Sequence, residues 1–282
     1  MPPGIRGRDD LVTGSLTWRW SPSRRQRWPA SAWIDEWLDT GETRWFARVA
    51  DPAGVVGPPI VFVHGVVVSG DYFWPVADVL LGDYAMYVPD LPGTGRSQLR
   101  NSTWTIPEQA AVLAGWMDAH GLTGTLLVAN SLGAQVVTEL AVTRPDLAAA
   151  LVLAGPTSDP DAASVFRMLF RGLKDIPRER FGIWRVWLPD LFRTGPIRGL
   201  RRLRQGLRDP QLDRLADIPV PVVVVGGVDD PIAPPGWIEE MADEIEVSRG
   251  IVVPDAPHAL NFSNPHDLAR IIRAVAARIR NE

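Results

Sequence analysis

The chain has 282 residues, of which 46% are hydrophobic and 22% charged, and its formal net charge is -4. This composition is typical of a soluble globular protein, and no apolar run reaches the roughly 18 residues that a membrane span needs. The slightly acidic charge gives no reason to expect nucleic-acid binding, so a small-molecule substrate is the better prediction. The chain contains no cysteine, which excludes disulfides, thiolate metal sites and cysteine nucleophiles.

The first 30 residues form a basic, tryptophan-containing arm. The pair Arg24-Arg25 suggests a twin-arginine export signal, but the next residues are Gln26-Arg27-Trp28-Pro29 rather than an apolar segment. Export is therefore disfavoured, and we expect a cytoplasmic protein. Trp18, Trp20 and Trp28 could touch anionic lipid, although a flexible or core-packed arm is the favoured interpretation.

Polar and apolar residues alternate over residues 31–37 and again over 44–49, on either side of the turn Asp39-Thr40-Gly41. This pattern predicts an antiparallel hairpin. Beyond it the strand pattern changes to short continuous apolar runs, which are typical of strands buried on both faces. The runs cover residues 59–63, 85–88, 125–128, 150–153 and 220–225.

Helical spacing separates several of these runs, over 107–118 and 132–143. Strands alternating with helices predict an α/β fold with a mostly parallel, doubly wound sheet. A last helix is expected to begin at Pro265, with Ser263 or Asn264 as its cap. Its predicted buried face is formed by Leu268, Ile271, Ile272, Val275 and Ile279.

Residues 157–218 interrupt this alternation. They show helical spacing over 162–173 and 196–207 but no convincing strand, and they carry 13 Arg or Lys against 8 Asp or Glu. We therefore expect a helical lid inserted into one core formed by residues 31–156 and 219–282. Five aromatic residues of this segment are expected to line a pocket, at least in part, or else to dock the insertion onto the sheet. They are Phe166, Phe170, Trp184, Trp187 and Phe192.

Ser131 lies between an apolar strand and a helix, with the small residues Ala129 and Gly133 two positions before and after it. A sharp strand-to-helix turn leaves room only for small flanking residues and lifts the serine hydroxyl clear of the backbone. The alternative is a plain helix N-cap, a position that serine also favours. The motif thus makes Ser131 a candidate nucleophile that needs partners.

Two further motifs follow strands. His64-Gly65 places the backbone N–H of Val66 where it could form an oxyanion hole with that of Leu132, and the loop 90–97 reads Asp-Leu-Pro-Gly-Thr-Gly-Arg-Ser. Together with Ser131, this set resembles the α/β-hydrolase superfamily, in the branch with an H-G oxyanion loop and a D-x-P-G-x-G-x-S loop. The resemblance implies an α/β-hydrolase fold and a serine hydrolase that needs neither a metal nor an organic cofactor.

In that family the acid follows the strand after the lid, in a pattern similar to G-x-x-D-P. The pattern selects Asp230, which directly precedes Pro231, with Asp229 as its competitor and Asp159 as a weaker alternative. A carboxylate at this site would hold the tautomer of the catalytic histidine.

His258 is the expected general base, because it follows the strand 251–253 and completes the hydrolase order Ser, Asp, His. The other histidines have structural explanations: His64 belongs to the oxyanion loop, His120 ends a helix and His266 opens one.

The resulting hypothesis is hydrolysis of a carboxylic ester or related acyl compound through an acyl-enzyme. A carbon–carbon bond hydrolase of the meta-cleavage-product type is an alternative, since Asn130 beside Ser131 resembles the G-N-S-x-G of those enzymes and their lid arginines hold substrate carboxylates. A second alternative is a hydrolase-fold ligand-binding protein with little turnover. The oligomeric state stays open.

Overall fold

The computed structural model describes residues 19–22, 32–39, 43–55, 57–99, 104–157, 159–162 and 164–280. Most of the arm 1–30, including Trp18 and Trp28, lies outside the described residues, as do Thr40 and Gly41 of the predicted turn. The strands are β1 (Arg19–Pro22), β2 (Ile34–Asp39), β3 (Thr43–Ala50), β4 (Ile60–Val63), β5 (Met86–Asp90), β6 (Gln98–Leu99), β7 (Thr125–Asn130), β8 (Ala148–Ala154), β9 (Val222–Gly227) and β10 (Ser248–Val253). The α-helices are α2 (Trp74–Val79), α3 (Ile106–Ala119), α4 (Gly133–Thr143), α5 (Val165–Asp175), α6 (Trp184–Thr194), α7 (Pro196–Gly206), α8 (Pro235–Asp243), α9 (Leu260–Ser263) and α10 (Pro265–Ile279).

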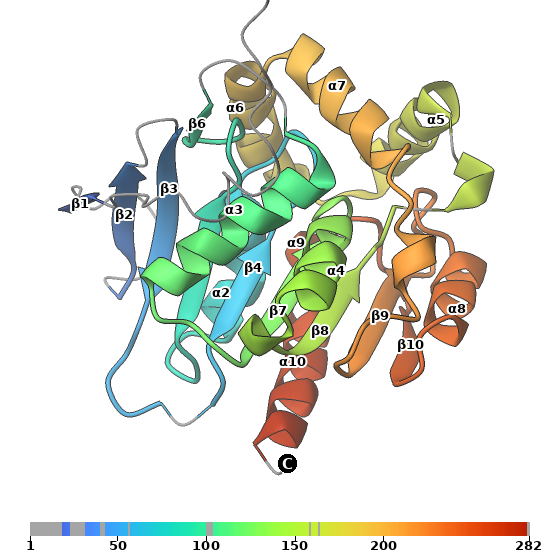
Figure 1. Cartoon of the computed structure of the whole chain (residues 1–282). Helices are drawn as coiled ribbons and strands as arrows, with labels where there is room; N and C mark the ends of the chain where they lie inside the picture. Colours follow the sequence, from blue (N-terminus) through green and yellow to red (C-terminus); the bar gives the residue numbers. More distant parts are fainter. Residues whose placement is uncertain are drawn as a thin grey trace, which may run out of the picture.

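The strands form one twisted sheet in the order β1-β2-β3-β5-β4-β7-β8-β9-β10, with β6 paired to β3 (Figure 1). β2 and β3 pair antiparallel, with Trp37 opposite Phe46, so the predicted hairpin is confirmed. From β5 to β10 every neighbouring pair is parallel. The predicted α/β fold with a mostly parallel, doubly wound sheet is therefore confirmed.

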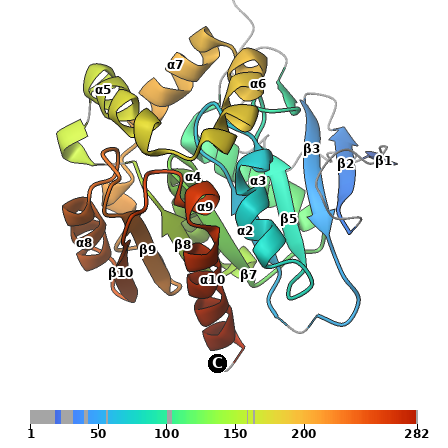
Figure 2. The same cartoon turned by 180° about the vertical axis from the view of Figure 1, so that it is seen from behind.

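Helices cover both faces of the sheet. α3 and α4 lie on the face seen in Figure 1, whereas α2, α9 and α10 lie on the opposite face (Figure 2). Alternate residues of each parallel strand point to opposite faces, so one strand contributes to two cores. Leu127 packs with the α3 and α4 side chains, whereas Leu126 and Val128 pack with those of α2 and α10.

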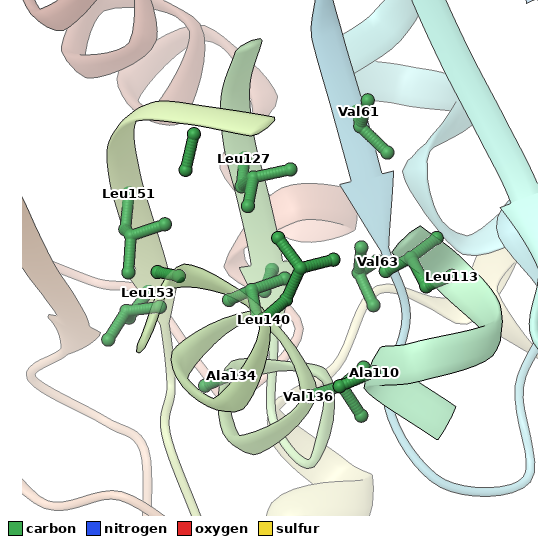
Figure 3. Packing of buried hydrophobic residues seen from close by; sticks show 14 of the residues in the cluster. Val61, Val63, Ala110, Leu113, Leu127, Ala134, Val136, Leu140, Leu151 and Leu153 are labelled. Atoms are coloured by element: carbon green, nitrogen blue, oxygen red, sulfur yellow. The ribbon is translucent and has the colours of Figure 1, made fainter. Parts of the chain in front are cut away.

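The first core shows how the buried runs position the site. Strand residues Val61 and Val63 meet Leu113 of α3 and Leu140 of α4 in a close-packed layer (Figure 3). Each fully buried side chain of this size contributes about 1.5–3 kcal/mol relative to an exposed one. The carboxyl ends of β4 and β7 are thereby held side by side.

The starts of α3 and α10 illustrate two kinds of local signal. α3 starts with a capping box in which the Thr105 hydroxyl accepts from the Glu108 N–H and the Glu108 carboxylate accepts from the Thr105 N–H. α10 begins at Pro265 as predicted, but Asn264 at its N-cap position makes no side-chain cap hydrogen bond. Its side-chain amide donates to the Asp255 carbonyl at 3.4 Å instead, so Asn264 occupies the predicted cap position without a side-chain hydrogen bond to the helix.

Between β8 and β9 the chain forms α5, α6 and α7, which lie over the carboxyl ends of the parallel strands (Figure 1). The spacing predicted α5 and α7 but missed α6, which contains Pro189 in its interior, where proline normally breaks a helix. Buried Arg202 of α7 anchors this helical insertion, because it donates to the Pro92 carbonyl at 2.9 Å and to Gln109 Oε1 at 2.6 Å. Within the described ranges, no helix is both long enough and apolar enough to span a membrane.

Candidate active site

Ser131 follows β7 directly and has a φ of +57°, a backbone conformation that side-chain-bearing residues rarely adopt. Its neighbours explain the small residues of the motif. A Cβ on Gly133 would lie 2.3 Å from the Val63 carbonyl oxygen, and one on Gly65 would lie 2.9 Å from the Ser131 Cβ. The turn therefore needs glycine at both places to bring Ser131 close to the loop after β4.

His258 and Asp230 meet across two loops that follow neighbouring strands. His258 Nδ1 lies 2.8 Å from Asp230 Oδ2. Asp230 Oδ1 accepts from the N–H groups of Ile232 and Ala233 at 2.7 and 2.9 Å, which fixes the carboxylate. Because the carboxylate is an acceptor, Nδ1 carries the hydrogen and Nε2 is left to accept a proton.

The two alternative acids lie elsewhere. Asp229 is exposed, and its backbone N–H donates to the Ala256 carbonyl at 3.1 Å. Asp159 is buried, but its carboxylate pairs with Arg171 and accepts from the Asp161 N–H. Asp230 is the one of the three that contacts His258.

Val66 and Leu132 both line the cavity that contains Ser131 and His258. Leu132 immediately precedes α4, so its N–H is among those at the helix start that have no partner within the helix. The arrangement brings two backbone segments, the loop after β4 and the start of α4, to one side of Ser131.

The His64 ring holds the loop after β4 against the loop after β5. The Leu91 N–H donates to His64 Nε2 at 2.8 Å, and His64 Nδ1 lies 2.8 Å from the Gly65 carbonyl. Complete burial lowers the pKa of His64 to about 3, so the ring is neutral. His64 thus has the structural role expected of it.

The loop 90–97 is built around Asp90. Its carboxylate accepts from the N–H groups of Gly70 and Arg96 at 2.7 and 2.8 Å. Gly95 has a φ of +52°, and a Cβ there would lie 2.3 Å from Asp90 Oδ2. The motif at this place therefore shapes the loop itself.

A cavity of about 690 Å³ opens above Ser131, between the sheet and the helical insertion. Its insertion wall is apolar and comes from α5, α6 and α7. The residues of this wall include Met168, Leu169, Leu173, Trp184, Trp187, Leu188, Leu191, Leu200, Leu203 and Leu207. On the core side, Tyr72 and Ile232 complete the lining.

The expectation for the five insertion aromatics is correct for two of them. Trp184 and Trp187 line the cavity, with ring centroids 5.6 Å apart. Phe166, Phe170 and Phe192 do not line it; they are 79%, 51% and 81% exposed. Helical spacing identifies apolar positions but not which side of a helix faces the cavity. Here α5 and α6 also carry large apolar side chains outside the part of each helix that lines the cavity.

The arginines of the insertion do not reach the cavity. Among the described lining residues there is no Arg or Lys, and the titratable ones are Tyr72, Asp175 and His258. Arg171 pairs with Asp159, and Arg193 pairs with Asp190 at 3.1 Å. The arginines of this segment therefore make their contacts away from the cavity wall.

Asn130 also has a structural explanation. Its side-chain amide donates to the Ala154 carbonyl at 3.1 Å and to the His258 carbonyl at 3.4 Å. It thus ties the end of β8 to the His258 loop, a role that does not depend on the bond that is cleaved.

Two acidic residues near His258 were missed by the sequence analysis. Asp175, at the end of α5, accepts from the His258 backbone N–H at 3.2 Å, and Glu179 accepts from the Ala259 N–H at 2.6 Å. They lie more than 75 positions before His258 in a basic segment, and no local pattern marks them. Only their contacts across the fold reveal them.

Burial alone would lower the pKa of His258, but its environment reverses this effect. The charge and hydrogen bond of Asp230, with smaller contributions from Asp175 and Glu179, raise the pKa of His258 to about 9. The imidazole is therefore held toward its protonated form by three surrounding carboxyl groups.

Comparison with known proteins agrees with this fold. Residues 60–271 match the model of the alpha/beta hydrolase family, and the chain belongs to this family. It is 26% identical, over 77% of its length and 90% of the other protein, to an (E)-2-((N-methylformamido)methylene)succinate hydrolase of Acinetobacter baylyi. It is 28% identical to the dihydrolipoyllysine-residue acetyltransferase component of an acetoin cleaving system of Cupriavidus necator, covering 76% of this chain but only 62% of that protein. A thermophilic esterase from Thermogutta terrifontis, crystallised with malate, has the same fold with a TM-score of 0.67, 24% identity and coverage of 83% of this chain and 95% of that one.

Proposed function

We propose that the protein is a serine hydrolase that cleaves a carboxylic ester or related acyl compound through an acyl-enzyme. The observation that carries the proposal is the 2.8 Å contact of His258 with Asp230 at a cavity that Ser131 also lines. Covalent labelling by a fluorophosphonate, with the modified peptide identified by mass spectrometry, tests the assignment of Ser131.

In the proposed reaction, Ser131 Oγ attacks the acyl carbon while His258 Nε2 accepts the hydroxyl proton. The N–H groups of Val66 and Leu132 stabilise the resulting oxyanion. His258 then returns the proton to the alcohol oxygen as the ester bond breaks. A water molecule, deprotonated by His258, then attacks the acyl carbon, and His258 returns that proton to Ser131 Oγ as the acyl–Oγ bond breaks and the acid leaves. Asp230 keeps the tautomer that exposes Nε2 throughout.

The cavity wall supports a neutral, apolar substrate. The insertion, which we propose acts as a lid over the core formed by residues 31–156 and 219–282, contributes mainly leucine and tryptophan side chains. A bound acyl or aryl group would be desolvated against them, which is favourable in proportion to the apolar area buried. The nearby Asp175 carboxyl disfavours a substrate anion, and the described part of the lining offers such an anion no arginine. These features favour ester hydrolysis over cleavage of a carboxylated dienone.

We expect medium-chain and aryl esters to be cleaved with a higher kcat/KM than acetate esters, because each added methylene buries more apolar surface, worth about 0.8 kcal/mol. We also expect their kcat/KM to exceed that of a carboxylated meta-cleavage dienone. Measuring kcat/KM for p-nitrophenyl esters of graded length and one such dienone, each at two salt concentrations, checks this. A dienone preference with rates that fall at high salt would show that a cation binds the substrate, contrary to the cavity described above.

The pH dependence follows from the raised pKa of His258. The base must be unprotonated to accept the Ser131 proton, so kcat/KM should be low in acid and rise with pH. Because the pKa of His258 is raised to about 9, the rise should lie on the alkaline side of an ordinary imidazole. A pH profile of kcat/KM for a neutral p-nitrophenyl ester measures it, with enzyme stability checked at each pH. A plateau already reached at pH 7 would contradict this environment for His258.

A further inference from the structure

The helical insertion contacts the His258 loop through two carboxyl groups. Asp175 Oδ1 accepts from the His258 backbone N–H, while Glu179 Oε1 accepts from the N–H of Ala259. Glu179 Oε2 also accepts from the Ser263 hydroxyl at 2.7 Å. The segment from the end of α5 to Glu179 thus forms hydrogen bonds to His258, to the residue after it and to the helix α9 that follows.

The two carboxyl groups also interact with each other. Their side chains are hydrogen bonded, and Glu179 is the partner that is protonated more easily. Burial first, and then repulsion from Asp175, raises the pKa of Glu179 to about 8. Burial likewise raises the pKa of Asp175. The two carboxyl groups therefore titrate as a coupled pair, with Glu179 ionised only toward alkaline pH.

Two further titratable groups lie close to this carboxyl pair. Asp230 faces His258 from the loop after β9, and Tyr72, from the short 3-10 turn Gly70–Phe73, faces the same carboxyl groups and remains neutral because burial raises its pKa. In the part of the chain that the structure describes, no group of three or more His, Asp or Glu is placed to hold a metal ion. A buried carboxyl pair is costly unless its hydrogen bonds are satisfied, and the His258 loop supplies several of them.

We propose that Asp175 and Glu179 are positioning residues through which the helical insertion sets both the orientation and the protonation of the general base. The inference rests on the proposed role of His258. It assigns to the insertion a second task besides lining the cavity, because displacement of α5 would remove the acceptor of the His258 N–H and a negative charge near the imidazole together. Access to the cavity and activity of the base are thereby coupled.

The two effects can be separated by substitution. Asp175→Asn keeps an oxygen that can accept from the His258 N–H but removes the charge, and Glu179→Gln does the same for Ala259. In both variants the pKa of His258 should fall, because His258 titrates near pH 9, above the pKa of about 8 of Glu179, and each substitution removes a carboxyl group that is negative in that range. The rise of kcat/KM with pH should then move to lower pH, with KM for a neutral ester little changed. Asp175→Ala removes the acceptor as well, and we expect its plateau kcat to fall roughly tenfold to a hundredfold from misplacement of the base.

Asp190→Asn is the matched control. Asp190 is a buried carboxylate of the same insertion, paired with Arg193, and it is not among the groups that shift the pKa of His258. This variant should keep the wild-type pH profile even if its melting temperature falls. A purely structural role for the acidic pair would make all four variants alike, with lower melting temperatures and unchanged profiles.

An NMR titration of the His258 ring, assigned by comparison with His258→Gln, measures the same pKa without turnover. The expected result is a lower pKa in Asp175→Asn and Glu179→Gln than in wild type and in Asp190→Asn. An unchanged His258 pKa in both acidic-pair variants would overturn the proposal. A failure of the serine-hydrolase proposal would be seen separately, as a wild-type protein that fluorophosphonate does not label. The NMR titration would still report the pKa of His258 in that case.

Discussion

Replacing Ser131 by alanine should abolish covalent labelling by a fluorophosphonate and lower ester turnover by several orders of magnitude. A nucleophile and its base act as a unit, so removing one removes most of what both contribute. The residual rate would come from substrate binding and from the N–H groups proposed as the oxyanion hole. Labelling and kcat/KM on a p-nitrophenyl ester are the two measurements.

The fold should survive this substitution, because alanine removes one oxygen and keeps the Cβ that contacts Gly65. Circular dichroism and melting temperature are therefore expected to stay near wild type. Ser164→Ala is the control, since Ser164 is an exposed serine at the start of α5 whose side chain accepts from the Arg167 N–H. Undiminished turnover in Ser131→Ala would refute the serine-hydrolase proposal. Binding of an apolar ester without turnover by the wild type would instead favour a ligand-binding protein.

Asp230→Asn should cost on the order of 10⁴-fold in kcat, as loss of the orienting carboxylate does in serine hydrolases. An amide can donate to Nδ1, which stabilises the wrong imidazole tautomer and leaves Nε2 protonated. The charge that stabilises the imidazolium is lost as well, so the pKa of His258 should fall at the same time. Steady-state kinetics over a range of pH measure both consequences.

Asp229→Asn provides a matched control one residue away. Asp229 is exposed and its backbone, not its side chain, makes the contact with Ala256. Solvent screens an exposed charge of this kind, so its removal has little effect on the buried His258. The kcat should therefore remain within a few-fold of wild type. Equal losses in the two variants would mean that His258 is not oriented by Asp230.

The parallel core was predictable because its signals are local. A strand buried on both faces needs a continuous apolar run, and the helices between such strands need apolar residues at helical spacing. The tight turn at Ser131 is also marked locally, by the small residues Ala129 and Gly133, although the atom that demands glycine at position 133 is the Val63 carbonyl oxygen of the distant strand β4. The pairing of His258 with Asp230 was inferred from the family pattern around Pro231, and the structure brings these two side chains together.

The insertion was less predictable, because what matters there is which way each helix faces. α6 was missed since Pro189 gives a breaking signal that the packing around buried Val186 and Asp190 overrides. Spacing alone did not distinguish Trp184 and Trp187, which line the cavity, from exposed Phe166 and Phe192.

Local sequence determined the order of the strands and helices and marked the turn at Ser131, since these signals are carried by residues that are neighbours in the chain. The surroundings of His258 depend instead on groups that are far apart in sequence. Asp175 and Glu179 come from the insertion, Asp230 from the loop after β9 and Tyr72 from the region before α2. Burial and charge act through space, so the raised pKa of His258 and the absence of basic residues from the described cavity lining emerged only once the helices were placed over the sheet.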